Sequence, residues 1–411
     1  MNAPKIYVTG LGVVSAAGLG VDALWQAVCD QTSATTSLYS ANSLHAESVL
    51  MPVGAVPWAT QPISGIIDAK TAKTTDRSFL LGRIALDEAM GDAGLTAHEW
   101  IDPSRVAVVV GSELAGVSCL EAFTSYLRSV EFSRPVRPRL ATMTTSGVAG
   151  YYAEQIGAHG PSFVVSSACA SSGYALGLAR LLLLTGQVDY ALVGGTEAPL
   201  TDTIVGAMIG LGALDPASSA DPARACRPFD ASRTGTVMAE GAGFLVLQAD
   251  TVATPARPKA MLAGFGCGSD AYHRTAPHPE GRGAVSALTL ALKSAEIDRF
   301  DHVNAHATAT RLNDKIESYA LATVVSSDTR VSATKGVHGH ALAASAAIEN
   351  VLAVRSIVEN TIPGITNLNV VGDDISPIRL QRETAHHPVA AAANISVGFG
   401  GYNTAAVFTA V

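Results

Sequence analysis

Cys169 is the residue of this chain best placed for nucleophilic catalysis. It lies in SFVVSSACASSGYALGLARLLLLTG, where a run typical of a buried strand passes directly into a run typical of a helix. A thiol at such a junction meets the positive end of the helix dipole and unpaired backbone N–H groups, which favour the thiolate and lower the pKa. Its small neighbours would let a substrate approach and a backbone N–H face an oxyanion. The alternative is an inert buried cysteine, which is common.

Two histidines occupy the same kind of position. His306 follows the predicted strand DHVNA and precedes a Thr/Ala loop, while His340 follows Gly339 and opens an Ala-rich predicted helix. Functional side chains are often presented where strands and loops pass into helices. A lone histidine is more often structural, but two at matching positions, together with the cysteine, indicate one shared site. His338 is predicted to point elsewhere.

Strand-like and helix-like runs alternate along the whole chain. β-Branched runs such as KIYVTG, RVAVVVGS and YALVGGT, separated by stretches such as RSFLLGRIALDEAMGDAGL, predict a layered α/β fold. The proline-containing stretch ADTVATPARPK predicts a junction between two halves, residues 1–250 with the cysteine and 251–411 with the histidines. No short repeat links the halves, so any duplication must lie in the structure. Residues 31–75 are predicted to be a loop-rich excursion.

Composition excludes several classes of protein. Of 411 residues, 48% are hydrophobic and 15% charged, which suits a large core and argues against disorder. The net charge of −8 disfavours a nucleic-acid-binding protein. The start has no signal-peptide pattern, and the most apolar helix candidate is too short to span a bilayer, so we expect no membrane insertion. Five cysteines without paired ligand spacing predict no metal site and, without a secretory signal, a cytoplasmic location.

Eight motifs in order resemble those of the β-ketoacyl-acyl carrier protein synthases, condensing enzymes of the thiolase-like superfamily. They are VTGLGVVSAAG, VSSACASSGYAL, YALVGGTEAPL, RPFDASRTGTVMAEGAGFLVL, GSDAYHRTAP, VNAHATATRLNDKIE, KGVHGHALAASAAIE and NISVGFGGYNTAAVF. The resemblance spans essentially the whole chain and points to the elongating, two-histidine type II enzymes. It implies a five-layered αβαβα sandwich of two similar halves, and a decarboxylative Claisen condensation in fatty acid, polyketide or polyene biosynthesis.

The resemblance implies a role for each matching catalytic residue. Cys169 becomes the acyl-accepting nucleophile, and His306 and His340 become the decarboxylation pair. Lys335 matches the lysine that supports this pair, together with Glu317.

The resemblance also implies the substrate-binding positions. Phe399 matches a gatekeeper whose backbone N–H helps to bind the oxyanion, with Gly400 and Tyr402 beside it. Thr308 and Thr310 match the threonines that line the pantetheine tunnel. No metal or redox cofactor is expected, because the substrate arrives on the phosphopantetheine arm of a separate acyl carrier protein.

Several positions depart from the family pattern. Ala307 and Ala309 replace glycines, which adds methyl groups where the pantetheine arm should thread. ALAAS follows His340 in place of a Gly-Ala-Ala-Gly stretch, Gly336 stands where serine is common, and Tyr402 replaces a threonine. These departures leave the reaction class intact and bear on substrate and chain length.

An acidic carrier protein would need a local basic patch on this acidic chain. Lys70, Lys73 and Arg77 cluster at near-helical spacing and match carrier-docking positions of the family, although an ordinary solvated face would look the same. The family also implies a dimer, either with itself or with a chain-length factor. Three alternatives remain: a non-elongating partner subunit of the chain-length-factor type, a thiolase or acyl-hydrolase use of the cysteine, and a scaffold protein without chemistry.

Overall fold

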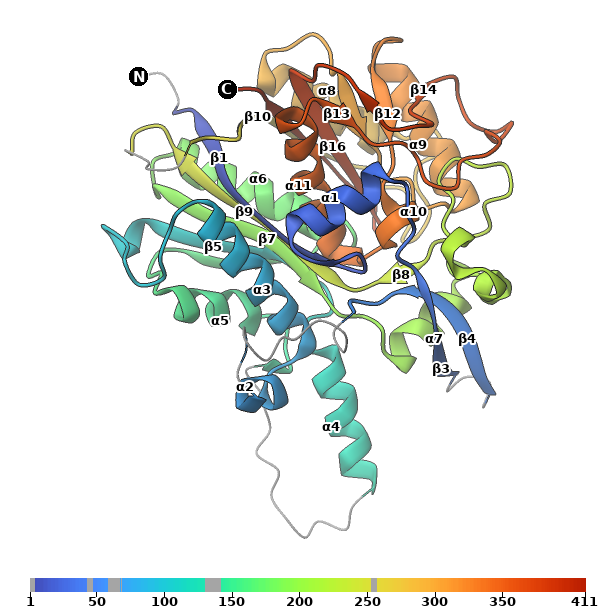
Figure 1. Cartoon of the computed structure of the whole chain (residues 1–411), viewed down its shortest axis with the longest axis horizontal. Helices are drawn as coiled ribbons and strands as arrows, with labels where there is room; N and C mark the ends of the chain where they lie inside the picture. The colour runs from blue at the N-terminus through green and yellow to red at the C-terminus, as the bar shows by residue number, and fades with distance from the viewer. Residues whose placement is uncertain (1–3, 43–46, 58–66, 68, 130–141, 253–256) are drawn as a thin grey trace.

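Two similar units of β-sheet form the centre of the molecule (Figure 1). The computed structural model describes residues 4–42, 47–57, 67, 69–129, 142–252 and 257–411. The first unit contains β1 (Ile6–Ser15), β5 (Val106–Gly111), β6 (Ser162–Val165), β7 (Tyr190–Glu197) and β9 (Gly241–Ala249). The second contains β10 (Ala260–Ser269), β11 (His302–Asn304), β12 (Arg330–Ser332), β16 (Ala391–Gly398) and β17 (Tyr402–Thr409).

The two units repeat one topology. In the first, β1–β9 and β9–β7 are antiparallel, whereas β7–β5 and β5–β6 are parallel. In the second, β10–β17 and β17–β16 are antiparallel, whereas β16–β11 and β11–β12 are parallel. The strands also follow one another along the chain in the same order. The chain is therefore duplicated in structure, although it has no short sequence repeat.

The units join edge to edge within one sheet of the described chain. Its order is β14-β12-β11-β16-β17-β10-β1-β9-β7-β5-β6, with β2 paired to β1. The joint between β1 and β10 is narrow, with Tyr7 opposite Met261 and Val8 opposite Ala260. The short strands outside the two units are β2 (Gly18–Leu19), β3 (Thr36–Asn42), β4 (Glu47–Gly54), β8 (Met238–Ala239), β13 (Thr361–Ile362), β14 (Arg379–Leu380) and β15 (Ala385–His386).

Helices complete five layers. In the central layer, α6 contacts β5, β7, β10 and β17, and α11 contacts β9 and β16, so both helices touch both sheet units. On the outer faces, α3 and α5 cover the first unit, and α8, with α9 packed on it, covers the second. This arrangement is the expected αβαβα sandwich. The helices are α1 (Val21–Cys29), α2 (Ala69–Thr74), α3 (Arg77–Asp92), α4 (Val117–Ser129), α5 (Gly147–Ile156), α6 (Ser171–Leu184), α7 (Asp202–Gly210), α8 (Arg282–Ala295), α9 (Arg311–Val324), α10 (Lys335–His338) and α11 (Ser345–Val358).

Glycines let the central helices approach the strands closely. A Cβ on Gly111, the last residue of β5, would lie 2.2 Å from the backbone nitrogen of Ser172 in α6. A Cβ on Gly243 of β9 would lie 2.6 Å from the backbone nitrogen of Ile348 in α11. The positions of both helices therefore depend on strand residues that have no side chain.

One expectation about local structure was wrong, and another was incomplete. The stretch SFVVSS is not a buried strand: β6 lies at the edge of the sheet, and Phe163 is 41% exposed, because no further strand covers it in the described chain. The predicted loop-rich excursion, residues 31–75, also contains a hairpin of β3 and β4, whose second strand pairs with β8.

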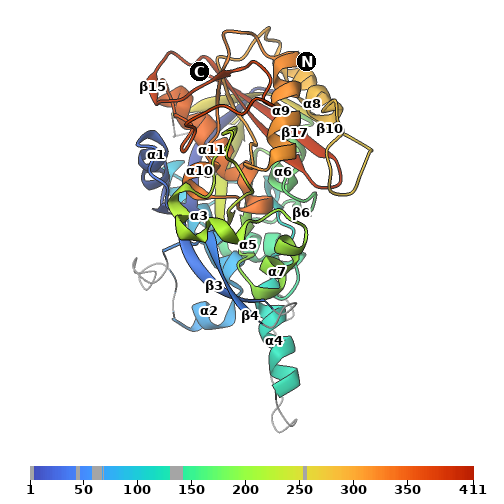
Figure 2. The same ribbon diagram turned by 90° about the vertical axis from the view of Figure 1, so that its right-hand side faces the viewer.

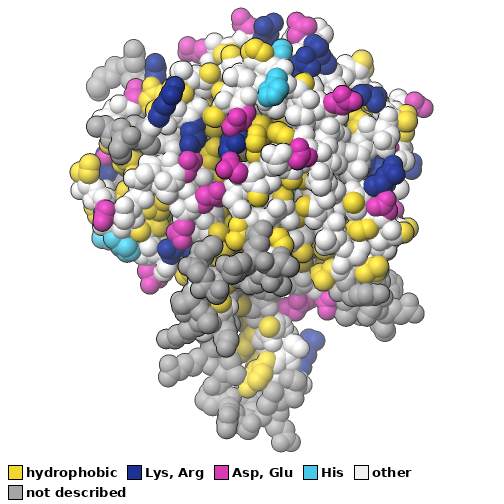
Figure 3. All heavy atoms as spheres, viewed as in Figure 1, with side chains coloured by type: hydrophobic (Ala, Val, Ile, Leu, Met, Phe, Trp, Pro, Cys, Tyr) yellow, Lys and Arg dark blue, Asp and Glu magenta, His cyan; other side chains and the backbone are white. Residues whose placement is uncertain are grey.

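The outer surface carries charges of both signs. Figure 3 shows acidic and basic side chains interspersed on the face seen in Figure 1, in keeping with a mildly acidic chain. Helix α4 extends away from the main body in both ribbon views (Figures 1 and 2). Within the described residues, no helix is both long and apolar enough to cross a membrane.

The close contact at Gly111 gives a test of the packing. Gly111→Ala should lower the free energy of unfolding by roughly 1–3 kcal/mol, because the new methyl group pushes on the first turn of α6. Gly91→Ala in α3 is the matched control, since a Cβ there meets nothing within 4 Å and should be neutral or slightly stabilising. Urea unfolding measures both, and equal stabilities for the two variants would contradict this account of the contact.

Candidate active site

Cys169 lies on a tight turn between β6 and α6, two residues before the helix begins. Ala168 has a φ of 50°, and the Ser171 hydroxyl fixes the turn by accepting from the Ser167 N–H at 2.8 Å and donating to the Ala168 carbonyl at 2.6 Å. Gly398 packs against the turn, where a Cβ would lie 3.2 Å from the Cys169 nitrogen. The turn thus places Cys169, which is 8% exposed, at the wall of a cavity.

His340 approaches this thiol from the second half of the chain. Its Nε2 is 3.1 Å from Cys169 Sγ, and its Nδ1 is 2.9 Å from the hydroxyl of Ser345. The sequence predicted that His340 opens a helix, but α11 begins at Ser345. The intervening turn brings the ring between the serine and the thiol.

Burial controls the protonation of the thiol. The pKa of Cys169 is raised to about 12, mainly because burial removes the thiol from water and secondly because of the charge of Glu113, while Lys335 opposes both effects. The expectation of a lowered pKa is therefore wrong for the resting site, because enclosure by protein outweighs the proximity of the helix. Burial also holds the pKa of His340 well below its usual range, so a neutral thiol faces a neutral ring. When the thiol donates to Nε2, the proton of the ring is on Nδ1 and points at Ser345.

His306 is fixed by a buried ion pair. The Lys335 ammonium lies 3.3 Å from Nδ1 of His306 and also pairs with the Glu349 carboxylate of α11. Lys335 and Glu349 are fully buried. Burial and the neighbouring ammonium hold the pKa of His306 well below its usual range, so the ring is neutral. Since an ammonium can only donate, Nδ1 accepts, and the ring proton is on Nε2.

Glu317 does not have the expected role. The resemblance implied that it supports the histidines together with Lys335, but it accepts from the backbone N–H groups of His306 and Ala307, at 2.6 and 2.7 Å. Burial raises its pKa to about 7. Glu317 therefore fixes the backbone that carries His306, while Glu349 binds the lysine.

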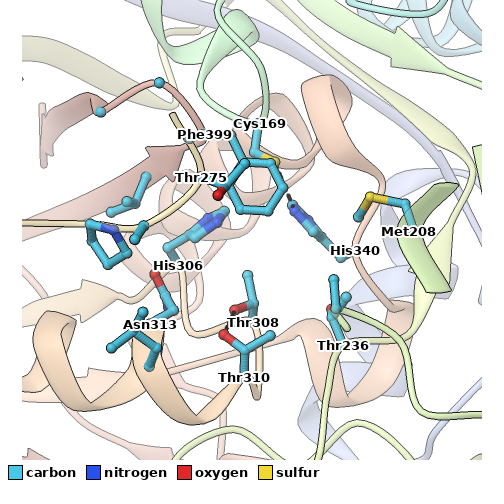
Figure 4. Close-up of a pocket in the computed structure, with 18 residues that line it drawn as sticks. Cys169, Met208, Thr236, Thr275, His306, Thr308, Thr310, Asn313, His340 and Phe399 are labelled. Carbon is cyan, nitrogen blue, oxygen red and sulfur yellow. Dashed lines mark hydrogen bonds between the residues drawn. The ribbon is translucent and has the colours of Figure 1, made fainter. Parts of the chain in front are cut away.

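The three candidate catalytic groups meet at one point (Figure 4). The imidazoles of His306 and His340 are 5.1 Å apart between ring centres and inclined at 84°. One donor atom from each ring and the sulfur of Cys169 all lie within 4.8 Å of one another. Such a set has the donors of a soft-metal site, but the Lys335 ammonium against His306 disfavours a cation there. The arrangement is suited to a nucleophile with an adjacent base and a second polar donor.

A cavity that is open to solvent lies in front of these groups. Phe399, 38% exposed, forms part of its wall, and Thr308 and Thr310 lie opposite Cys169 with their hydroxyls 3.0 Å apart. Both threonines and the predicted gatekeeper thus lie where the resemblance implied. The other lining residues are Met208, Ala213, Thr236, Thr275, Ala276, Pro277, Leu312, Asn313, Val397, Gly398, Gly400 and Gly401.

The two alanines that replace family glycines do not narrow this cavity. Ala307 and Ala309 are fully buried, and their methyl groups pack into apolar clusters away from it. Both keep positive φ values, 32° and 64°, in or near the left-handed region that favours glycine. The added methyl groups therefore lie outside the cavity, and the departure instead places strain on the loop that carries His306.

Gly400 and Tyr402 differ in position. Gly400 lines the cavity with a φ of 86°. Tyr402 is 41% exposed and packs edge-on against Tyr174, with ring centres 6.0 Å apart, beside the cavity and not in its lining. The contact of Tyr402 with substrate stays a prediction.

The predicted carrier-docking residues lie on and beside α2. The side chains of Lys70 and Lys73 lie outside the described residues. Arg77 binds the buried carboxylate of Glu240 through two nitrogens, both at 2.6 Å. The charge of Arg77 is therefore partly neutralised by Glu240 and is less available to a carrier protein.

Sequence reasoning missed two residues of the site. Glu349 and Ser345 both lie in ALAASAAIENVLAV, which was interpreted only as an Ala-rich helix. A single acidic residue in an otherwise apolar helix signals a buried partner, because an unpaired carboxylate is costly to bury. Ser345 lies in the ALAAS stretch, which departs from the family pattern. This departure was the sequence signal that could have identified Ser345 as a residue of the site.

Comparison with known families agrees with this geometry. Residues 3–253 match the family described as Beta-ketoacyl synthase, N-terminal domain, and residues 259–369 match its C-terminal domain. The chain is 30% identical to the Putative polyketide beta-ketoacyl synthase 1 of Streptomyces cyaneus, over 98% of each chain. It is 31% identical to the 3-oxoacyl-[acyl-carrier-protein] synthase 2 of Staphylococcus aureus, again over 98% of each.

Solved structures share the whole fold. A type II polyketide ketosynthase, in complex with its acyl-carrier protein and bound to a hexaketide, superposes with a TM-score of 0.89 at 26% identity and full coverage of both chains. A ketosynthase in complex with its chain length factor, from Xenorhabdus doucetiae, gives a TM-score of 0.84 at 26% identity, covering 99% of this chain and 98% of that one.

The buried thiol should show a steep pH dependence. With a pKa near 12, the thiolate fraction of Cys169, and hence its alkylation by iodoacetamide, should rise about tenfold per pH unit between pH 7 and 9. Peptide mass spectrometry measures this rate, with Cys169→Ala identifying the labelled peptide. A plateau below pH 8 would instead indicate a resting thiolate and imidazolium, and would contradict the neutral pair.

The ion pair should contribute strongly to stability. Lys335→Ala leaves the Glu349 carboxylate buried without a counter-charge and should lower the free energy of unfolding by about 3–5 kcal/mol. Asp22→Ala is the control, because it removes the exposed partner of Arg355 and should cost at most about 1 kcal/mol. Urea unfolding of Lys335→Ala within 1 kcal/mol of the parent would show that the pair is not structural.

Proposed function

Since this chain belongs to the β-ketoacyl synthase family, we propose that it is a β-ketoacyl-acyl carrier protein synthase that elongates acyl chains by decarboxylative condensation. The observation that carries this proposal is the convergence of Cys169, His306 and His340, from both halves of the chain, on one cavity. The thiol of Cys169 is in contact with a base, the imidazole of His340. The lysine binds Nδ1 of His306, which leaves the Nε2–H of that ring available as a donor. These are the parts that acyl transfer and enolate stabilisation need.

The first half-reaction loads the cysteine. His340 accepts the thiol proton at Nε2, and the sulfur of Cys169 attacks the carbonyl carbon of an acyl thioester. A new C–S bond forms to Cys169, the C–S bond to the pantetheine arm breaks, and the proton passes to the departing thiol. The backbone N–H of Phe399, at the cavity wall, is proposed as a donor to the oxyanion.

The second half-reaction forms the carbon–carbon bond. A malonyl thioester binds with its carbonyl oxygen facing Nε2 of His306 and of His340, and its carboxylate leaves as CO₂. The electrons of the broken C–C bond form an enolate, which the two N–H donors stabilise. The enolate carbon attacks the acyl-cysteine, the C–S bond breaks, and the Cys169 thiol is restored with one proton from solvent.

We propose that the chain works with separate partners. The solved neighbours include a ketosynthase bound to its acyl-carrier protein and a ketosynthase bound to a chain length factor, which supports a carrier partner and a dimer of one of these kinds. Exposed apolar side chains on α4 (Leu120 and Leu127) and on the edge strand β6 (Phe163) offer a surface for a second subunit.

The proposal extends to cofactor, location and product class. We propose no resident metal or redox cofactor, because each step above balances without one. A reactive thiol at Cys169 and an odd number of cysteines suit the reducing cytoplasm. The relatives include both fatty acid and polyketide synthases, which supports either product class. The intact set of cysteine, two histidines and lysine disfavours a non-elongating partner subunit.

The direct test is incubation with acyl- and malonyl-acyl carrier protein. Mass spectrometry should show an acyl adduct on Cys169, followed by a product two carbons longer. Cys169→Ala should form neither. An adduct that is only hydrolysed would favour the hydrolase alternative, and no adduct at all would overturn the proposal.

The histidine variants should separate the two half-reactions. His306→Ala removes one enolate donor and should slow malonyl decarboxylation by about 10²–10³-fold while leaving acylation of Cys169 within a few-fold. His340→Ala should slow both steps, because His340 also receives the thiol proton. Rapid-quench measurement of each step checks this, and equal loss of acylation in both variants would contradict the division of roles.

A further inference from the structure

The two half-reactions make opposite demands on one nitrogen of His340. In the loading step Nε2 lies 3.1 Å from the sulfur of Cys169 and must be free of a proton, so that it can accept the one from the thiol. Once Cys169 carries an acyl group, its sulfur has no proton to donate, and the same nitrogen must hold a proton to stabilise the enolate. This requirement rests on the proposed condensation. A neutral ring can accept at Nε2 in one half-reaction and donate there in the other only by changing tautomer. The group that contacts Nδ1 must therefore be able to hydrogen-bond to this nitrogen both with and without its proton.

Ser345 is the group at Nδ1. Its hydroxyl lies 2.9 Å from Nδ1 of His340, and the serine is fully buried at the first position of α11. A hydroxyl can accept a hydrogen bond from N–H or donate one to a bare ring nitrogen, by rotation about its C–O bond. A backbone carbonyl or carboxylate could only accept, and a backbone N–H could only donate.

We propose that Ser345 is a positioning residue that lets His340 exchange tautomers between the half-reactions. Before acylation, Nδ1–H donates to the hydroxyl and Nε2 accepts the thiol proton. After acylation, the hydroxyl donates to Nδ1 and Nε2–H faces the thioester carbonyl. The exchange removes one proton from Nδ1 to solvent and adds one from solvent at Nε2, so the number of protons on the ring is unchanged and no co-reactant is consumed.

His306 needs no such partner, and its surroundings differ accordingly. The Lys335 ammonium at its Nδ1 is a donor only, which fixes the proton on Nε2 in both half-reactions. The two imidazoles therefore have different assignments. His306 is a permanent donor, and His340 alternates.

The chain contains a matched control in the same helix. Ser356 of α11 is also fully buried, and its hydroxyl lies 3.0 Å from Nδ1 of His302, outside the cavity. Ser345→Ala and Ser356→Ala thus each remove a buried serine hydroxyl from Nδ1 of a histidine. A loss that is only structural should affect both variants alike.

Rapid-quench kinetics with the full-length protein tests the proposal. Ser345→Ala should slow both acylation by acyl-carrier protein and condensation with malonyl-carrier protein at least tenfold. Ser345→Thr, which keeps the hydroxyl, should recover most of each rate. Ser356→Ala should leave the acylation and condensation rates within twofold of the wild-type values, even if this variant has a lower unfolding temperature. Wild-type rates in Ser345→Ala, or equal losses in the two alanine variants, would overturn the proposal.

A spectroscopic reading is independent of these rates. NMR of protein labelled with ¹⁵N-histidine reports which ring nitrogen holds the proton, and the His340 signals are assigned by their loss in His340→Ala. The His340 ring should carry its proton on Nδ1 in the resting protein. The proton should be on Nε2 after Cys169 is alkylated with iodoacetamide, which mimics the acyl-enzyme. An unchanged tautomer would overturn the inference while leaving the proposed function intact. An absence of acylation and condensation in the wild type would instead overturn the proposed function.

Discussion

The site depends on one buried positive charge. The Lys335 ammonium is fully enclosed, paired with Glu349 of α11 and directed at His306 on the loop after β11. A charge so deep is tolerated only when its partners are in place, because losing one leaves the other uncompensated. The lysine thus ties α10, α11 and the His306 loop into one arrangement. The same contact fixes which nitrogen of His306 holds the proton.

Duplication of the fold explains how distant residues meet. Cys169 precedes α6 and His340 precedes α11, and these two helices occupy equivalent places in the central layer of the two halves. Because the layer is shared, the approaches to both helices come together. Each half supplies a different chemical group to this point, a thiol from the first and an imidazole from the second.

Burial gives the resting site its character. Removal from water raises the pKa of the thiol and lowers the pKa of both imidazoles, so the groups in contact are neutral. A neutral pair keeps the nucleophile protected until a thioester is present, and neutral rings can act as hydrogen-bond donors to a developing enolate. The same enclosure makes the hydrogen-bond partners of each ring decisive, because no water replaces them.

The sequence by itself determined the layered α/β class and three residues of the candidate site, Cys169, His306 and His340. The alternation of elements and the positions of these residues at element boundaries are local properties of the chain. The sequence also marked Thr308, Thr310 and Phe399 through family motifs. Only the tertiary structure decided that Glu349, not Glu317, binds the lysine, that Ser345 faces His340, and that the methyl groups of Ala307 and Ala309 avoid the cavity. These outcomes depend on which side chains meet across packed layers, and on the water that packing removes, and neither is a property of sequence neighbours.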